Sequence, residues 1–336
     1  MPHLMRVVVR PHSPAERKHH LRARQARPAP TVRVAGLPAT PEHDLKFRGG
    51  RTIAHLSYVN VYVGGSAAWS RTDVDAIDGA LDHAMADHRL NNVMRQYFAN
   101  EPIATTFVSS QFTGSRRPKV VTQTSTEKLV TDLFRSGHLA NLEFDSSVVN
   151  LLLPSGTVLT DGTGTGREDD RQGAAASRRK PGKPETEEVS SLEGLGGYHG
   201  SVDIGRTRVY YAVGVYSERL ANGKENGIAV FDEPWKNVVA TFYHELNEAR
   251  TDPDVEEAIR TNRVEGIIGW NSDDGEECGD FPVFEAGDAG NLDLVFREVS
   301  VAGGEAPVQF QYSNAVHGPE GPISSPHRPA STHEMA

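Results

Sequence analysis

The chain has 336 residues, 37% of them hydrophobic and 24% charged, which suits a globular protein with one large core or two modest ones. Its formal net charge of −10 argues against general nucleic-acid binding. The sequence has no apolar run long enough to span a bilayer and no visible signal peptide, so the cytoplasm is the default location expected. The single cysteine, Cys278, excludes an intrachain disulfide.

The first part of the chain is a basic segment followed by strand and helix patterns. Residues 1–48 are rich in Arg, His and Pro without periodicity, which predicts a disordered tail. Residues 53–63 are mostly β-branched or aromatic and end at two glycines, which predicts a strand. Thr72 is the candidate cap of the next helix. The apolar stripe of that helix consists of Val74, Ile77, Leu81 and Met85.

Two more strands and a helix are predicted before the composition changes. Residues 103–112 and the run 148–153, which is apolar except for Asn150, are typical of strands. Between them, Thr124 and Glu127 form a capping-box pattern that predicts a helix start. Residues 161–191 contain almost no large apolar side chain, so we predict a disordered insertion there.

The segments after the insertion are predicted to form a single domain with those before it. Residues 208–216 alternate as a strand does, and a further strand is predicted at 292–296. The segment 317–336 is rich in Pro, Ser and His and is expected to be a disordered tail. We therefore predict an α/β (α+β) fold, a mixed sheet with packed helices, in a single domain over 52–316 that the insertion interrupts.

The most informative stretch is TFYHELNEARTDP, which has helical spacing and ends at Asp252-Pro253, a stop signal. On this helix His244 and Glu248 lie one turn apart on one face, where two side chains can bind one ion. Glu245 stands where the H-E-x-x-H metalloproteases place their general base, although the second His of that motif is Glu here. The H-E-x-x-E pattern thus predicts a zincin-like helix.

An acidic loop, NSDDGEECGD, follows Trp270 and offers further ligands. Glu277 and Asp280 are spaced to complete an ion shell begun on the helix, whereas Asp273 and Asp274 are interpreted as a solvated turn. A His ligand favours Zn²⁺ or another transition metal, and all-oxygen ligation would suit Ca²⁺. The sequence therefore predicts a metal site with Zn²⁺ first and Ca²⁺ as the alternative.

His199 and Cys278 are weaker candidates. His199 lies in a Gly-rich turn before a strand, where it is either a turn residue or, at the strand start and facing a cleft, a ligand or transition-state donor. Cys278 is expected to be a small packed residue. The sequence contains no nucleophile elbow, phosphate loop or dinucleotide fingerprint in the required context.

Several pieces, taken in order, resemble the exordium-like, or phosphate-induced, protein family of plants and its bacterial relatives. The main pieces are Gly197-Tyr198-His199, H-E-L-x-E-A-x-T-D-P at 244–253, Gly269-Trp270, Glu277-x-Gly279-Asp280 and Val308-Gln309-x-x-Tyr312-Ser313-Asn314. The resemblance covers about 53–316 and implies an extracellular or cell-wall protein linked to growth responses, with a poorly defined activity. The chain lacks the cysteines that plant members carry around the Tyr-His turn and the chain end.

The leading functional hypothesis is a metal-dependent hydrolase of the peptidase or amidase type. Glu245 would deprotonate a metal-bound water that attacks an amide or ester carbonyl, with His199 as a fourth ligand or oxyanion partner. The metal ligands would be His244, Glu248 and either Asp280 or Glu277. No substrate can be named; a peptide or a cell-surface polymer is one option.

Two alternatives stay open. In the first, the chain is a non-catalytic binding or structural protein in which the same residues hold a structural Ca²⁺ or Zn²⁺. In the second, no metal binds, and Glu245 and Glu248 accept hydrogen bonds from backbone amides of the Trp270 loop.

Overall fold

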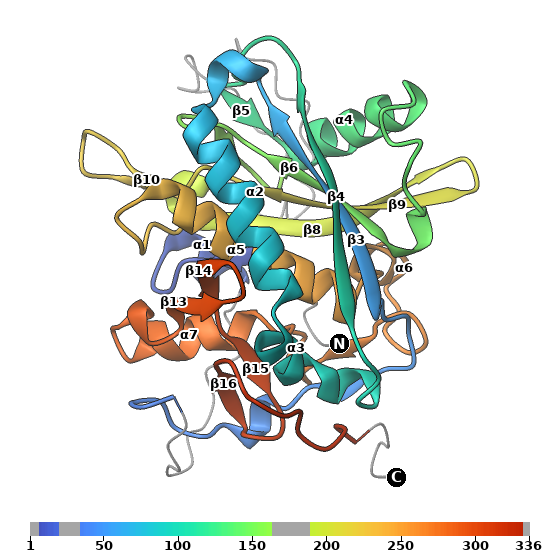
Figure 1. Cartoon of the computed structure of the whole chain (residues 1–336), viewed down its shortest axis with the longest axis vertical. Helices are drawn as coiled ribbons and strands as arrows, with labels where there is room; N and C mark the ends of the chain where they lie inside the picture. Colours follow the sequence, from blue (N-terminus) through green and yellow to red (C-terminus); the bar gives the residue numbers. More distant parts are fainter. Residues whose placement is uncertain (1–6, 20–33, 163–188, 332–336) are drawn as a thin grey trace, which may run out of the picture.

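The computed structural model of the chain describes residues 7–19, 34–162 and 189–331 (Figure 1). Its centre is a six-stranded mixed sheet with the strand order β1-β8-β9-β6-β3-β4. The strands are β1 (Val7–Val9), β3 (His55–Val63), β4 (Ala104–Thr113), β6 (Ser147–Leu152), β8 (Leu195–Ile204) and β9 (Thr207–Gly214). The pairs among β4, β3, β6 and β9 are parallel, and β8 joins β9 and β1 antiparallel. The predicted α/β class with a mixed sheet is confirmed.

Helices cover both faces of this sheet because side chains alternate along each strand. Tyr58 and Tyr62 of β3 pack against the face covered by α2 (Arg71–Ala86) and α5 (Pro234–Thr251) (Figure 1). The next residues in the alternation, Val59 and Val61, pack on the other face, where α4 (Gln123–Arg135) lies. Apart from the exposed edge strand β4, the sheet is therefore buried between two layers, and α5 lies within the first.

Smaller elements complete the domain. The short helices are α1 (Pro14–His19), α3 (His88–Met94), α6 (Val255–Thr261) and α7 (Asp280–Asp288). The 3₁₀ helices are η1 (Pro41–His43), η2 (Ser66–Ala68), η3 (Arg95–Phe98), η4 (Phe144–Ser146), η5 (Ser191–Glu193) and η6 (Leu292–Leu294). The two-stranded ribbons pair β10 (Glu218–Arg219) with β11 (Glu225–Asn226), β2 (Lys46–Phe47) with β12 (Trp270–Asn271), β13 (Phe296–Val301) with β14 (Gly304–Gln309), β15 (Gln311–Ser313) with β16 (Gly318–Glu320), and β5 (Val120–Val121) with β7 (Val158–Leu159).

Both predicted tails contain ordered structure, so these predictions were wrong in part. The valines of β1 are buried and pair antiparallel with β8, because an edge strand needs only a short apolar run. Residues 34–48 also belong to the domain, through β2. At the other end β16 pairs with β15, and the Ala330 amide donates to the Gln96 carbonyl at 2.9 Å. Of the predicted insertion 161–191, residues 163–188 lie outside the described residues.

Three predicted element boundaries also differ. Ser70, not Thr72, caps α2, because its side chain accepts from the Asp73 amide at 3.4 Å. The capping box of α4 is formed by Thr122 and Ser125, two residues before the predicted one. The strand predicted at 292–296 was wrong, since η6 occupies most of it and β13 begins only at its last residue.

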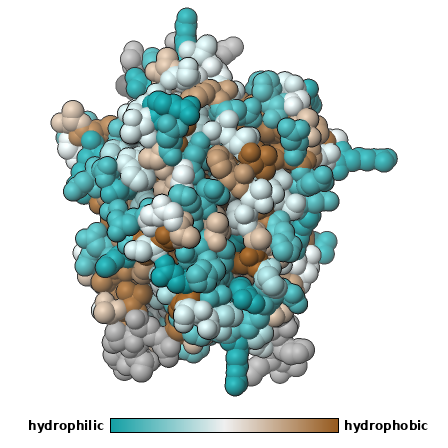
Figure 2. All heavy atoms as spheres, viewed as in Figure 1, coloured by the Kyte–Doolittle hydropathy of each residue, from teal (hydrophilic) through white to brown (hydrophobic). Residues whose placement is uncertain are grey.

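The face of the molecule shown in Figure 2 is mostly polar. Figure 2 shows hydrophilic and intermediate residues over most of one face, with small separate hydrophobic patches. Within the described ranges, no helix combines the length and apolar character that a bilayer crossing requires. The candidate metal ligands His199, His244 and Glu248, in contrast, lie in the interior.

Candidate metal centre

Helix α5 is buried along most of its length. Every residue from Asn237 to Thr251 is buried, and the helix ends before Asp252-Pro253, as predicted. A helix buried on all sides brings its polar side chains into the core, where each needs a partner inside the protein. The H-E-x-x-E residues are thus core groups, and their contacts define the site.

His244 and Glu248 lie on one face of α5, with 3.1 Å between His244 Nε2 and Glu248 Oε2. The other ring nitrogen, Nδ1, is 2.5 Å from Oε1 of Gln309 on β14. The amide of Gln309 is oriented by its own NH₂ group, which donates to the Gly279 carbonyl at 2.7 Å. Its oxygen therefore accepts from Nδ1–H, and the lone pair of Nε2 in neutral His244 is directed at Glu248.

Glu248 lies at the centre of the cluster. Its Oε1 accepts from the Gly279 amide at 3.0 Å. Its Oε2 has no hydrogen-bond partner among the described residues and is 3.7 Å from His199 Nδ1. One oxygen is thus fixed by the loop before α7, and the other lies between two histidines.

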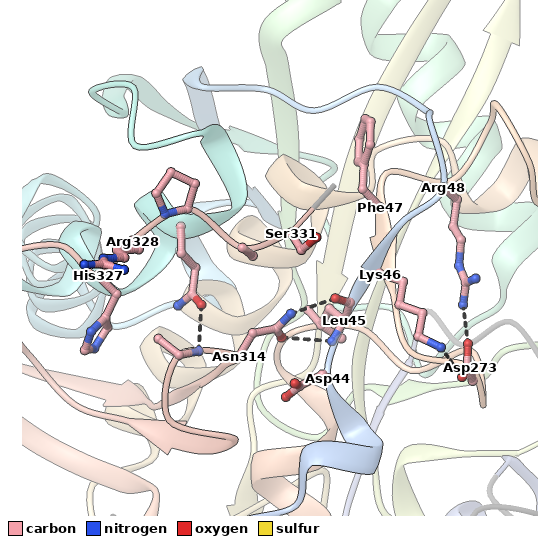
Figure 3. Close-up of a pocket in the computed structure, with 14 residues that line it drawn as sticks. Asp44, Leu45, Lys46, Phe47, Arg48, Asp273, Asn314, His327, Arg328 and Ser331 are labelled. Carbon is pink, nitrogen blue, oxygen red and sulfur yellow. Dashed lines mark hydrogen bonds and ion pairs between the residues drawn. The ribbon is translucent and has the colours of Figure 1, made fainter. Parts of the chain in front are cut away.

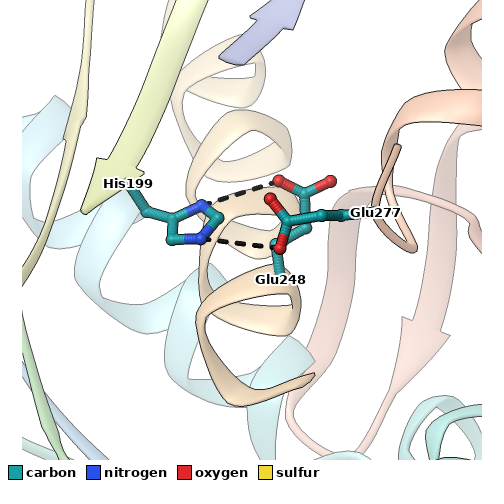
Figure 4. A group of neighbouring side chains, drawn as sticks. All are labelled: His199, Glu248 and Glu277. Atoms are coloured by element: carbon teal, nitrogen blue, oxygen red, sulfur yellow. Dashed lines mark ion pairs between the residues drawn. The ribbon is translucent and has the colours of Figure 1, made fainter. Parts of the chain in front are cut away.

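His199 reaches the cluster from the sheet. It lies in the middle of β8, not at a strand start, and it is buried with 1% of its surface exposed, so the predicted cleft position was wrong. Figure 4 shows the ring facing the carboxylates of Glu248 and Glu277, which both lie on the same side of it. Nδ1 is 3.3 Å from Glu245 Oε2, and Nε2 is 3.3 Å from the Asp252 carbonyl oxygen and 3.6 Å from Glu277 Oε1.

The acidic loop supplies two more carboxylates, as predicted. Both oxygens of Glu277 lack a hydrogen-bond partner among the described residues, and the side chain is fully buried. Asp280 Oδ1 also lacks such a partner and is 4.0 Å from His244 Nε2, while Oδ2 accepts from the Glu277 amide at 3.0 Å. The structure therefore brings together all six predicted site residues.

The sequence did not assign a role to Asp252 or Gln309. Asp252 is fully buried, and its Oδ1 accepts from the Gly269 amide at 3.2 Å while Oδ2 has no partner among the described residues. We interpreted it only as a helix stop. Gln309 orients His244. Its place in the segment 308–314 belongs to the family resemblance but does not by itself indicate contact with a histidine. An alternating strand cannot reveal which distant side chain it will meet.

The cluster is electrostatically unbalanced. None of its five carboxyl groups forms an ion pair with a lysine or arginine within the part of the chain that the structure describes. Burial raises the pKa of Glu245 to about 8, although the hydrogen bond with His199 opposes this. Burial, helped by neighbouring carboxylates, raises the pKa of Asp252, Glu277 and Asp280 well above the usual range. Burial is the largest single influence on the pKa of His244 and lowers it, but the charges of Glu248 and Asp280 and the hydrogen bonds to Glu248 and Gln309 together raise the pKa above its ordinary value.

Two groups of side chains in this cluster could hold a metal ion. One comprises His199, Glu248 and Glu277, and the other His244, Glu248 and Asp280. Within each group the ligand atoms lie within 4.8 Å of one another. Glu248 belongs to both.

The remaining candidates lie where the sequence analysis expected them. Asp273 is exposed and pairs with Lys46 and Arg48 at 2.5 and 3.0 Å, and Asp274 is exposed beside it. Cys278 is buried and packs in an apolar cluster. The metal-free alternative is met in part, because Glu248 does accept from a backbone amide, but Glu245 contacts His199 instead.

A cavity elsewhere in the molecule is distinct from this cluster. It has a volume of about 1010 Å³ and is lined by residues 44–48, 327–331 and a few others, including Asn314 (Figure 3). Lys46 and Arg48 extend there toward Asp273, which neutralises part of their charge. None of the cluster's histidines or carboxylates lines this cavity.

Comparison with known proteins gave no match to a protein-family model, a curated protein or a solved structure. The resemblance to the exordium-like family therefore stays a prediction, and function has to be argued from the cluster itself.

Proposed function

We propose that the chain is a metal-binding protein in which at least one buried divalent metal ion links helix α5, strand β8 and the loop before α7. One observation carries this proposal. Seven polar atoms of the cluster lack hydrogen-bond partners among the described residues: His244 Nε2, Glu245 Oε1, Glu248 Oε2, Asp252 Oδ2, both Glu277 oxygens and Asp280 Oδ1. Buried unpaired carboxylates are costly, and a cation that they coordinate removes this cost.

The ligand chemistry favours a transition metal. Both candidate ligand groups contain an imidazole, from His199 or His244, together with carboxylates. Such a mixed set suits Zn²⁺ and similar ions, whereas Ca²⁺, the alternative, prefers oxygen ligands only. The hydrogen bond between His244 Nδ1 and Gln309 also supports metal binding through Nε2, since ligating histidines are held by their second nitrogen in this way.

Burial favours a structural role over a catalytic one. His199, His244, Glu248, Glu277 and Asp280 each expose 1% of their surface or less. A catalytic metal needs an open coordination position that a substrate can reach. A closed site between a helix, a strand and a loop instead links segments that are distant in sequence, and its binding free energy adds to the stability of the fold.

Metal analysis of protein purified without chelator, combined with thermal melting, tests this proposal. We expect at least about one equivalent of divalent metal per chain and a melting temperature about 10 °C lower after chelation. Less than one equivalent, together with no change in melting on chelation, would refute the proposal. That result would favour the metal-free alternative, in which carboxylates such as Glu248 accept hydrogen bonds from backbone amides of the loop after Trp270.

A second candidate is the metal-dependent hydrolase, favoured by the position of Glu245. This side chain lies next to His244 on the helix, and its Oε1 has no hydrogen-bond partner among the described residues, as a general base requires. Glu245→Gln separates the candidates. In the hydrolase it abolishes cleavage of peptides or activated esters while the metal content stays unchanged. If wild-type protein with full metal content cleaves neither, the structural role stands alone.

A further inference from the structure

We infer that the cluster binds two divalent cations that share Glu248, one beside His199 and Glu277 and the other beside His244 and Asp280. This inference rests on the proposed metal binding and adds its stoichiometry and architecture. It begins from the two ligand groups, which overlap at a single residue.

The geometry separates the two histidines. Ligands about 2.1 Å from one ion lie at most about 4.2 Å apart. Within the described residues, neither group of mutually close ligand atoms contains both His199 and His244, although each contains Glu248. A single ion at either position therefore leaves one histidine outside its coordination shell. Two ions use both.

Glu248 has the right surroundings for a shared ligand. Its Oε2 is 3.1 Å from His244 Nε2 and 3.7 Å from His199 Nδ1, so one oxygen faces both positions. Its Oε1 is already occupied by the Gly279 amide. Carboxylates that bridge two ions about 3.5–4 Å apart are a recurring feature of two-metal sites.

Each position also has an unpaired carboxylate of its own. Glu277 faces His199 with both oxygens unpartnered among the described residues, and Asp280 Oδ1 faces His244 in the same condition. These two side chains approach from one loop, and the hydrogen bond from the Glu277 amide to Asp280 fixes their separation. The loop thus presents one ligand to each position.

Charge supports the same count. The five carboxylates carry five negative charges when ionised, and no lysine or arginine of the described residues pairs with them. One divalent ion would leave three of these charges uncompensated in the core, whereas two leave one. An uncompensated buried charge is strongly unfavourable, so the second ion removes a large electrostatic cost.

Titration of chelator-treated full-length chain with Mn²⁺ tests the inference, using metal analysis for stoichiometry and electron paramagnetic resonance for coupling. We expect about two equivalents per chain and a broadened signal at saturation, because ions about 4 Å apart are magnetically coupled. About one equivalent with an unbroadened signal would overturn the two-ion architecture and leave the proposed function intact. Two uncoupled equivalents would overturn the shared Glu248. No binding of Mn²⁺ or Zn²⁺ would overturn both proposals.

Variants assign the two positions. His199→Asn and His244→Asn should each reduce binding from about two equivalents to about one and remove the coupling, because each deletes one terminal ligand. Glu248→Gln should weaken both positions together. His55→Asn, at an exposed site on β3, is the matched control and should keep both equivalents. If either site variant does not fold, the stoichiometry and coupling of the unmodified chain decide the question.

Discussion

The two aspartates on either side of Pro253 have opposite surroundings. Asp254 Oδ1 is 2.9 Å from Arg208 Nη1 and accepts from the Tyr210 hydroxyl at 3.0 Å. Asp252, two residues earlier, is fully buried, has no such cation among the described residues and keeps one oxygen unpaired. Two neighbouring carboxylates therefore differ in their charge balance. Asp254 is paired with an arginine of the protein, whereas Asp252 has no cationic partner among the described residues.

The same difference separates two groups of charged side chains, one around Arg208 and the other around Glu248. Arg208 also contacts Asp203 and Glu257, and these groups remain partly exposed to water. The carboxylates of the buried cluster around Glu248 are shielded from solvent, and no arginine of the described residues pairs with them. Even Arg250, buried on the same helix, donates to Thr105 and to other neutral acceptors. A cluster of carboxylates without a cationic partner among the described residues could hold a metal ion, which is the basis of the proposed function.

Neutralising one buried carboxylate should sharpen this comparison most. Glu277→Gln is expected to remove the ion beside His199, reducing metal binding from about two equivalents to about one, and to cost the metal-loaded protein about 4 kcal/mol of unfolding free energy. In chelated protein the same change removes a carboxyl group whose pKa is raised well above its ordinary value on folding, which costs stability at neutral pH, so it should stabilise instead.

Denaturant unfolding with and without metal would reveal this reversal of sign. Asp274→Asn, on the exposed part of the same loop, is the control and should have little effect in either state. Destabilisation of the chelated protein by Glu277→Gln would mean that the carboxylate has a partner other than metal.

The pH dependence of the chelated protein is the second test. The folded-state pKa of Glu245 is about 8, above its ordinary value of 4.5, and the pKa of His244 is also raised. A raised folded-state pKa gives stability that is full at low pH and is lost as pH rises through the folded value. Chelated protein should therefore lose a few kcal/mol of stability between about pH 5 and 8.

Metal should oppose this loss, because ligands bind it in their deprotonated forms. The metal-induced rise in melting temperature is thus expected to grow over the same pH range. Calorimetric melting at several pH values measures both effects. A chelated protein that becomes more stable toward pH 8 would contradict the electrostatic account of the cluster.

Close packing at Gly279 offers a third, smaller test. A Cβ atom there would lie 2.3 Å from His244 Nδ1 and 2.8 Å from Glu248 Oε1. Gly279→Ala should displace both ligands, weaken metal binding and cost about 2 kcal/mol of stability. Gly79→Ala in α2, where a Cβ has open space, is the control and should be neutral or slightly stabilising. Unchanged metal affinity in Gly279→Ala would show that the loop is not part of the site.

The smallest effect is expected on the exposed side of the comparison. Arg208→Gln removes the cation shared by Asp203, Asp254 and Glu257, and should cost about 1 kcal/mol because partly solvated pairs are screened by water. The loss should shrink at high salt and leave metal content unchanged. Chemical denaturation at two salt concentrations measures it. A loss that salt does not alter would indicate a packing role for Arg208.

Local patterns were sufficient to predict much of this molecule. Helical periodicity and the Asp252-Pro253 stop signal predicted α5, a run of β-branched and aromatic residues predicted β3, and an apolar run predicted β6, because these signals act within a few residues. Helical spacing alone placed His244 and Glu248 on one face. Short strands such as β1 and β16 could not be predicted, since their pairing depends on partners far along the chain.

The sequence by itself determined the chemistry of the cluster: a helix that presents His244 and Glu248, and a nearby supply of carboxylates. Only the tertiary structure decided that His199 enters from the middle of β8, that Asp252 joins the core and that Gln309 orients His244. It also decided that no arginine accompanies these charges within the described residues. Residue type fixes which atoms can bind an ion, but distance, burial and charge balance arise only when α5, β8 and the acidic loop pack together.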